Sequence, residues 1–204
     1  MPTDAPEEIL LISLDDRGML DEMYGRLFDK LLQHFRLKRA RTAPGFLRYL
    51  DQKNPKAILV VDGGFASEAQ PEFFIRVRNY LLNGGLVVIG LLFPSFTKPS
   101  DFDAMFRNSG ISWKTGHYHR EYFSRRSECY LPPSISHTKL PLTYNAKALQ
   151  VSNIPVGERL YQSQNGQAAV AGKKIGEGYL MYMGDVNGEE EQTKIILECL
   201  QVGN

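Results

Sequence analysis

The 204-residue chain lacks the features of a secreted or membrane-embedded protein. Its two cysteines, Cys129 and Cys199, are too few for a disulfide framework. The longest nearly pure apolar run, residues 86–93, is far shorter than the roughly 20 residues that span a bilayer. Residues 1–8 contain no basic region followed by an apolar stretch, so we expect no secretory signal. We expect a cytoplasmic protein without a membrane partner.

The chain also lacks an excess of charge of either sign. Lys and Arg number 24 and Asp and Glu 23, which gives a net charge of +1 and no electrostatic reason for a nucleic-acid partner. A basic stretch at residues 36–41 has no interleaved aromatics and is typical of a solvated strand edge. No sequence feature indicates a cofactor. Length and composition indicate one globular domain over residues 1–204, with a disordered tail over residues 1–8.

Apolar patterning in the first half predicts an α/β fold. Residues 9–14, 57–62 and 86–92 are short apolar runs of the kind found in strands buried on both faces. Amphipathic helical patterns over residues 19–35 and 71–84 separate them. This alternation predicts a mostly parallel, flavodoxin-like sheet with helices on both faces, in which the three runs are neighbours.

The second half predicts an antiparallel extension of that sheet between residues 117 and 183. Short strands are expected at residues 117–123, 149–151 and 179–183. Asn165-Gly166 joins two further strand-like segments and is the strongest short hairpin signal in the chain. A final helix is expected to begin at Glu189.

Three segments carry a resemblance to a known superfamily. Residues 58–66 form a buried run that ends in Gly-Gly, residues 82–94 a helix end followed by a strand and a turn, and residues 176–187 a late strand. In order and spacing they resemble the class I glutamine amidotransferase-like superfamily, which includes PfpI-type and ThuA-like proteins. The resemblance covers residues 9 to about 200 and implies an elbow after the strand at residues 86–90.

The same segments depart from the family pattern at the catalytic positions. The resemblance places Leu91 where the family has its cysteine nucleophile, and leucine has none to offer. The family's late histidine has no counterpart in residues 185–187. We therefore expect a catalytically degenerate protein that binds a small ligand or a protein partner and does not hydrolyse glutamine. The alternative is a hydrolase or ThuA-like sugar-modifying enzyme that uses a non-cysteine site in the same crevice.

In parallel α/β sheets the ligand crevice lies beyond the carboxyl ends of the strands. Gly63 and Gly64 could present N–H donors to an oxyanion there, or form a tight turn without a ligand. Asp15 or Asp16 could bind a hydroxyl or cap the following helix, and Asn187 could bind a ligand or cap the last helix. The predicted ligand-binding residues are Asp15, Asp16, Gly63, Gly64, Pro94, Ser95 and Asn187.

One histidine-rich segment is a candidate for metal or acid–base chemistry. His117, His119 and Glu121 alternate, so a strand would place them on one face, where two imidazoles and a carboxylate can hold zinc or iron. The sequence shows no supporting shell for such a site, and we expect no metal. The candidate catalytic residues of the enzyme alternative are Asp16, Ser95, His117, His119 and Asp185.

Aromatic residues gather just after the strand at residues 86–92. They either cover the sheet or anchor an interface, because aromatics are enriched in interface cores. From this cluster we predict a homodimer. Its members are Phe93, Phe96, Phe102, Phe106 and Trp113.

Overall fold

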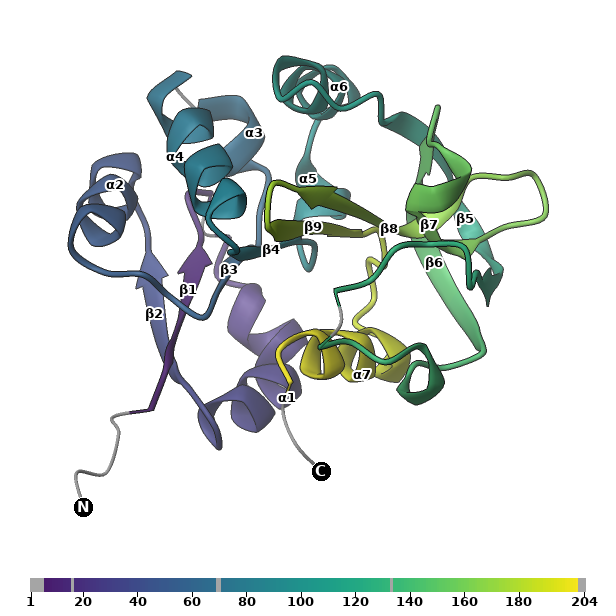
Figure 1. Ribbon diagram of the computed structural model, residues 1–204, viewed down its shortest axis with the longest axis horizontal. Coiled ribbons are helices and arrows are strands. Elements are labelled where there is room, and N and C mark those ends of the chain that lie inside the picture. Colours follow the sequence, from purple (N-terminus) through teal and green to yellow (C-terminus); the bar gives the residue numbers. More distant parts are fainter. Residues whose placement is uncertain (1–5, 16, 69–70, 133, 202–204) are drawn as a thin grey trace.

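The computed structural model describes residues 6–15, 17–68, 71–132 and 134–201, shown as a ribbon in Figure 1. The strands are β1 (Glu8–Ile12), β2 (Arg36–Ala40), β3 (Ala57–Val60), β4 (Leu86–Ile89), β5 (Lys114–Arg125), β6 (Thr143–Ser152), β7 (Arg159–Gln162), β8 (Ala168–Ile175) and β9 (Gly178–Met183). The helices are α1 (Leu20–Leu32), α2 (Ala43–Gln52), α3 (Gly64–Glu68), α4 (Pro71–Leu82), α5 (Phe93–Phe96), α6 (Pro99–Asn108) and α7 (Glu190–Cys199), with 3-10 turns η1 (His137–Lys139) and η2 (Val156–Glu158).

The four amino-terminal strands and β9 pair in parallel, in the spatial order β2-β1-β3-β4-β9. Ile9 lies opposite Ala57, and Ile58 lies opposite Val87, so the three apolar runs predicted as neighbouring parallel strands are confirmed as such. Parallel strands need helical crossovers, which α1 and α4 help to supply.

The prediction of a mostly parallel, flavodoxin-like sheet is wrong. Strands β5, β6, β7 and β8 pair antiparallel and close on themselves, because β6 pairs with β5 and β8, while β7 pairs with the same two strands. This closed antiparallel barrel joins the parallel strands through the antiparallel β8–β9 pair. Among the described residues five strand pairings are antiparallel and four are parallel. Closure removes the free edges that an open extension would expose.

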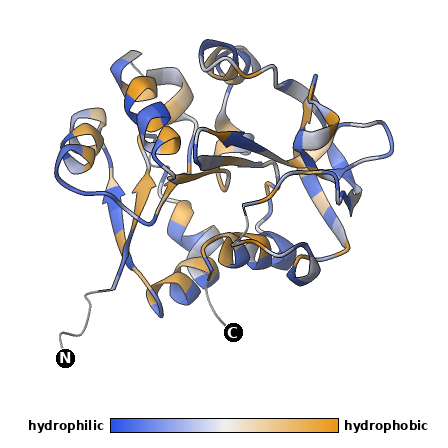
Figure 2. Ribbon diagram, in the orientation of Figure 1, coloured by the Kyte–Doolittle hydropathy of each residue, from blue (hydrophilic) through white to orange (hydrophobic). Residues whose placement is uncertain are grey.

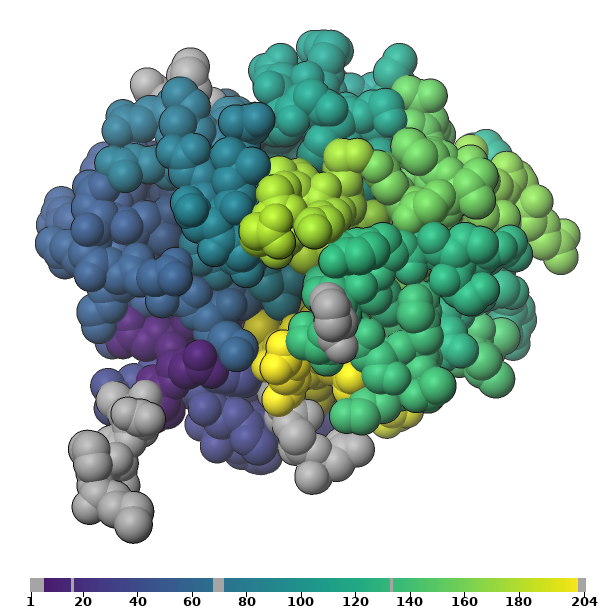
Figure 3. All heavy atoms as spheres, viewed as in Figure 1, coloured from purple at the N-terminus to yellow at the C-terminus, as the bar shows by residue number. Residues whose placement is uncertain are grey.

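Two apolar cores cover the two faces of the parallel strands. Helices α1 and α7 pack on one face with Ile9, Leu11 and Leu59, and α2, α4 and α6 pack on the other with Leu10 and Ile58. Successive residues of each strand thus enter opposite cores, as the alternation of side chains requires. In Figure 3, α7 (yellow) lies between α1 (purple-blue) and the green segment around η1, where Ser136 N–H donates to Glu198 Oε1 at 3.3 Å.

The basic stretch forms the edge strand β2, as its composition predicts. Figure 2 shows β1 in hydrophobic orange beside the largely hydrophilic β2. Arg39 Nη1 donates to Asp21 Oδ2 at 3.0 Å, so this stretch joins the ion pairs of the surface. The predicted tail is too long by at least Glu8, which pairs with Arg36 in the sheet and accepts a 2.7 Å hydrogen bond from Tyr49.

Most of the aromatic cluster belongs to the protein's own core. Phe93, Phe102, Phe106 and Trp113 are each at most 1% exposed, and Phe102 packs edge-on against Tyr182 with 5.3 Å between ring centroids. These four side chains therefore do not anchor an interface, which corrects that part of the prediction. Across the described ranges, no helix is long and apolar enough to cross a membrane.

Candidate functional site

The turn after β4 has a strained backbone geometry. Leu91 has φ +59°, a left-handed conformation that is unfavourable for leucine by about 1–2 kcal/mol. The fold enforces it, because Gly90 N–H donates to the Val60 carbonyl at 3.0 Å and a Cβ at Gly90 would approach Met183 to 3.1 Å. Strain of this kind is typical of functional positions. Here the strained residue carries an aliphatic side chain that is only 3% exposed.

A buried carboxylate follows β3. Asp62 is 2% exposed, and its Oδ1 accepts hydrogen bonds from the backbone N–H groups of Leu14, Asp15 and Gly64 at 3.1–3.2 Å. Burial raises the pKa of the Asp62 carboxyl, while these hydrogen bonds oppose the rise. The carboxylate ties the loop after β1 to the loop after β3.

A second buried carboxylate follows β9. Asp185 is fully buried and accepts hydrogen bonds from the Tyr144 hydroxyl at 2.6 Å, Asn187 N–H at 2.8 Å and Glu189 N–H at 2.9 Å. Burial raises the pKa of Asp185, and both burial and the neighbouring Asp185 raise the pKa of Tyr144. Asp185 thereby fixes the turn into α7, and Glu189, not Asn187, is the N-cap residue of that helix.

Packing and hydrogen bonds account for the Gly63-Gly64 loop. Gly64 N–H is engaged by Asp62, and a Cβ at Gly64 would come within 2.8 Å of the Asp15 nitrogen. A Cβ at Gly63 would come within 3.0 Å of the Phe96 carbonyl. The two glycines thus allow three loops to meet at the carboxyl edge of the sheet. Pro94 lies at the same edge on α5 and is buried.

The exposed rim of this edge is polar and aromatic. The Arg17 guanidinium pairs with Asp15 at 2.8 Å and lies 4.6 Å from the centroid of the Phe96 ring. Both members of the ion pair are about half exposed, at 46% and 40%. Ser95 is partly buried next to Phe96. Asp16 lies outside the described residues; the α1 N-cap residue is Met19 and makes no side-chain cap bond, so Asp15 does not cap this helix.

The histidines of β5 find partners away from the two buried carboxylates. His117 Nδ1 is 2.9 Å from Asn165 Nδ2, and His119 Nε2 is 2.9 Å from Glu121 Oε1. Both histidines are exposed. Within the described ranges, neither makes a hydrogen bond with Ser95 or Asp185, and no three His, Cys, Asp or Glu side chains gather as a metal-binding group. Asn187, the remaining ligand candidate, is exposed at the start of the turn into α7.

Sequence reasoning missed two residues that shape this edge. Arg17 is one of many surface-type arginines, and only the fold brings it over Phe96. Tyr144 lies in β6, 41 residues before its partner Asp185. Long-range partners of this kind leave no local signal in the sequence.

No family model matches the chain, and no curated protein matches it. Solved structures do match. A cytoplasmic protein of Salmonella typhimurium LT2 matches with a TM-score of 0.64 at 11% identity, over 96% of this chain and 98% of that one. A ThuA-like protein of Parabacteroides merdae matches with a TM-score of 0.56 at 14% identity, over 96% and 89%.

Larger enzymes contain the same arrangement. A β-galactosidase of Bacillus circulans sp. alkalophilus matches with a TM-score of 0.62 at 11% identity, over 94% of this chain. This chain spans only 30% of the length of that β-galactosidase. At these identities the matches show the fold alone. The fold is thus shared with two solved structures that are called ThuA-like.

Proposed function

We propose that this chain is a non-catalytic member of the class I glutamine amidotransferase-like superfamily that binds a carbohydrate at the carboxyl edge of its parallel strands. The observation that carries this proposal is Leu91. It has the left-handed backbone expected of a nucleophile elbow, yet presents a buried aliphatic side chain instead of a thiol or hydroxyl. Without a nucleophile the elbow has no group to form a covalent intermediate.

The two buried carboxylates support a binding role over an acid–base role. A general acid or base must reach the substrate to within hydrogen-bond distance. Asp62 and Asp185 are at most 2% exposed, and each already accepts three hydrogen bonds from the protein. Asp62 holds the loops after β1 and β3, and Asp185 holds the turn into α7.

The rim supplies the chemistry of a carbohydrate site. The Arg17–Asp15 pair offers donors and acceptors for hydroxyl groups, and the Phe96 ring beneath the Arg17 guanidinium holds that donor group in place. Two of the matched solved structures are called ThuA-like, and others are β-galactosidases or an exo-β-1,4-mannosidase. These names support a carbohydrate as the ligand class.

The enzyme alternative needs a histidine near a crevice nucleophile or carboxylate. His119 is paired with Glu121 on β5, and His117 of β5 is paired with Asn165 in the turn between β7 and β8. No observation on the described residues brings them to Ser95 or Asp185. The non-catalytic proposal is therefore the one the geometry favours.

A thermal-shift screen against a panel of mono- and disaccharides tests the proposal. A sugar present at ten times its Kd should stabilise the protein by about 1.4 kcal/mol, which raises Tm by roughly 3–6 °C. Arg17→Gln should abolish the shift, and Arg26→Gln, an equal charge change on the exposed face of α1, should leave it intact. Turnover of a stabilising sugar, or a shift that survives Arg17→Gln, would contradict the proposal.

A further inference from the structure

A second concavity lies on the face of the sheet that carries α4 and α6. It has a volume of about 510 Å³ and opens between these two helices, above β4 and β9. In Figure 1 the same region is the space between α4 and α6, with the β8–β9 hairpin beneath it. None of the rim residues Asp15, Arg17 and Ser95 contributes to its lining. The cavity is therefore separate from the site of the proposed function.

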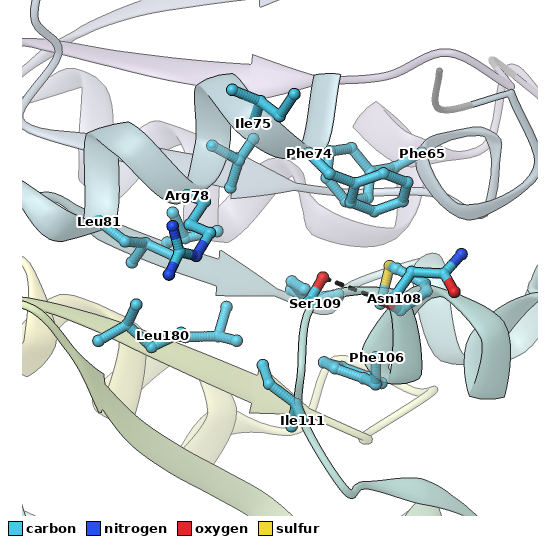
Figure 4. Close-up of a pocket in the computed structure, with 15 residues that line it drawn as sticks. Phe65, Phe74, Ile75, Arg78, Leu81, Phe106, Asn108, Ser109, Ile111 and Leu180 are labelled. Atoms are coloured by element: carbon cyan, nitrogen blue, oxygen red, sulfur yellow. Dashed lines mark hydrogen bonds between the residues drawn. The ribbon is translucent and has the colours of Figure 1, made fainter. Parts of the chain in front are cut away.

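The walls of the cavity are apolar. Phe65 and Phe74 lie at one end and Leu81 and Leu180 at the other, with Phe106 facing them from α6 (Figure 4). Volumes of 300–1,000 Å³ with walls of this kind are typical of small-molecule sites. Such walls offer water few hydrogen-bond partners. Transfer of an apolar ligand group from water into this space is therefore favourable.

One cation lies at this apolar cavity. Arg78 projects from α4, and Figure 4 shows its guanidinium between Leu81 and Leu180. Its neighbour on the same helix, Arg76, pairs with Asp51, whereas no carboxylate of the described residues pairs with Arg78. Ser109 also lines the cavity, and its hydroxyl already donates to the Met105 carbonyl at 2.9 Å. The Asn108 amide is a second polar group at the lining, and Arg78 supplies the charge that can recognise an anionic ligand.

From these observations we infer that the cavity binds an amphipathic carboxylate, a linear alkanoate of about eight to twelve carbons. The alkyl chain lies against Phe65, Phe106 and Leu180, and the carboxylate pairs with Arg78 at the mouth. A guanidinium holds a carboxylate through two parallel hydrogen bonds, which an alcohol cannot reproduce. A cationic headgroup is excluded by like charge. The ligand also covers the side chain of Ile75, which lines this cavity and is 56% exposed.

Titration calorimetry with octanoate, decanoate and dodecanoate, each below its critical micelle concentration, tests the inference. We expect one saturable site per chain, with an affinity that rises about fourfold for each added CH₂ group. Decanoate should bind about tenfold more tightly than decan-1-ol, and decyltrimethylammonium should not compete. Absence of saturable binding by dodecanoate, or equal affinity for the acid and the alcohol, would overturn the inference.

Variants separate charge recognition from occupancy of the cavity. Arg78→Gln should weaken decanoate binding about tenfold and leave decan-1-ol binding unchanged, whereas the control Arg26→Gln should change neither. Ser109→Phe places a ring in the mouth and should abolish binding of both ligands. Circular dichroism verifies that each variant is folded. Alkanoate binding that survives Ser109→Phe would overturn the inference, as would a dimer in light scattering that Ile75→Lys dissociates.

Discussion

Replacing Asp185 with alanine tests whether this carboxylate holds the turn into α7. Three donors lose their acceptor: the Tyr144 hydroxyl and the backbone N–H groups of Asn187 and Glu189. An unsatisfied buried donor costs about 1–3 kcal/mol. The net loss of stability is smaller than the sum of these three costs, because burial also disfavours the charged carboxylate that the substitution removes. We expect Asp185→Ala to lower the free energy of unfolding by about 3–5 kcal/mol.

Urea denaturation followed by circular dichroism measures this change, and a loss of 3–5 kcal/mol corresponds to a decrease in Tm of roughly 6–20 °C. Tyr144→Phe removes only one of the three donors and should cost about 1–2 kcal/mol. In the double variant the two losses should fall short of additivity by at least 1 kcal/mol, because the residues share a hydrogen bond. An Asp185→Ala protein within 1 kcal/mol of the wild type would refute this account of the turn.

Three further predictions concern the elbow, the pH dependence and the assembly. Leu91→Gly should be at least as stable as Leu91→Ala in urea denaturation, because glycine relieves about 1 kcal/mol of left-handed strain that alanine retains; a clear advantage for alanine would show that Leu91 is unstrained. Because burial raises the folded-state pKa of Asp185, its protonation stabilises the fold below the unfolded pKa of about 3.9, and that contribution is lost as pH rises through the folded pKa. The stability of the wild type relative to Asp185→Asn should therefore fall with rising pH above about 4, and a relative stability that rises would contradict the direction of this shift. The homodimer stays a prediction, and light scattering at micromolar concentration tests it: a dimer mass supports it, and a concentration-independent mass near 23.1 kDa refutes it.

The parallel half of the fold could be predicted because its signals are local. Within the predicted runs, residues 9–12, 57–61 and 86–89 are apolar without interruption, since each strand faces a core on both sides. The Asn165-Gly166 hairpin is local for the same reason, and the structure confirms it between β7 and β8. Patterns that extend over fewer than about ten residues thus identify these elements.

The closed barrel could not be predicted in the same way. Its strands contribute Phe123 and Tyr144 to the core, and these residues come from strands that meet only in the folded state. β5 and β6 are 12 and 10 residues long, although only short pieces of them have a clear strand pattern. Ring closure depends on pairing between β7 and both β5 and β8, which is a non-local property.

The candidate site divides along the same line. The strand before Leu91 could be predicted from its contiguous apolar residues, whereas the assignment of Leu91 to a nucleophile position rests on the resemblance. The engagement of Asp62 by Leu14 and Asp15 could not, since 47 or 48 residues separate these groups along the chain. The sequence alone does not distinguish an aspartate that holds loops through hydrogen bonds from one that acts as a catalytic base.

The most direct test of the central claim is an assay for ammonia release from glutamine by the purified protein. At the position that we propose for a nucleophile, Leu91 has a left-handed backbone and an aliphatic side chain, so we expect no release above that of buffer. Ammonia release that is lost when Ser95 or another crevice residue is replaced would contradict the account and show that Leu91 does not occupy the nucleophile position.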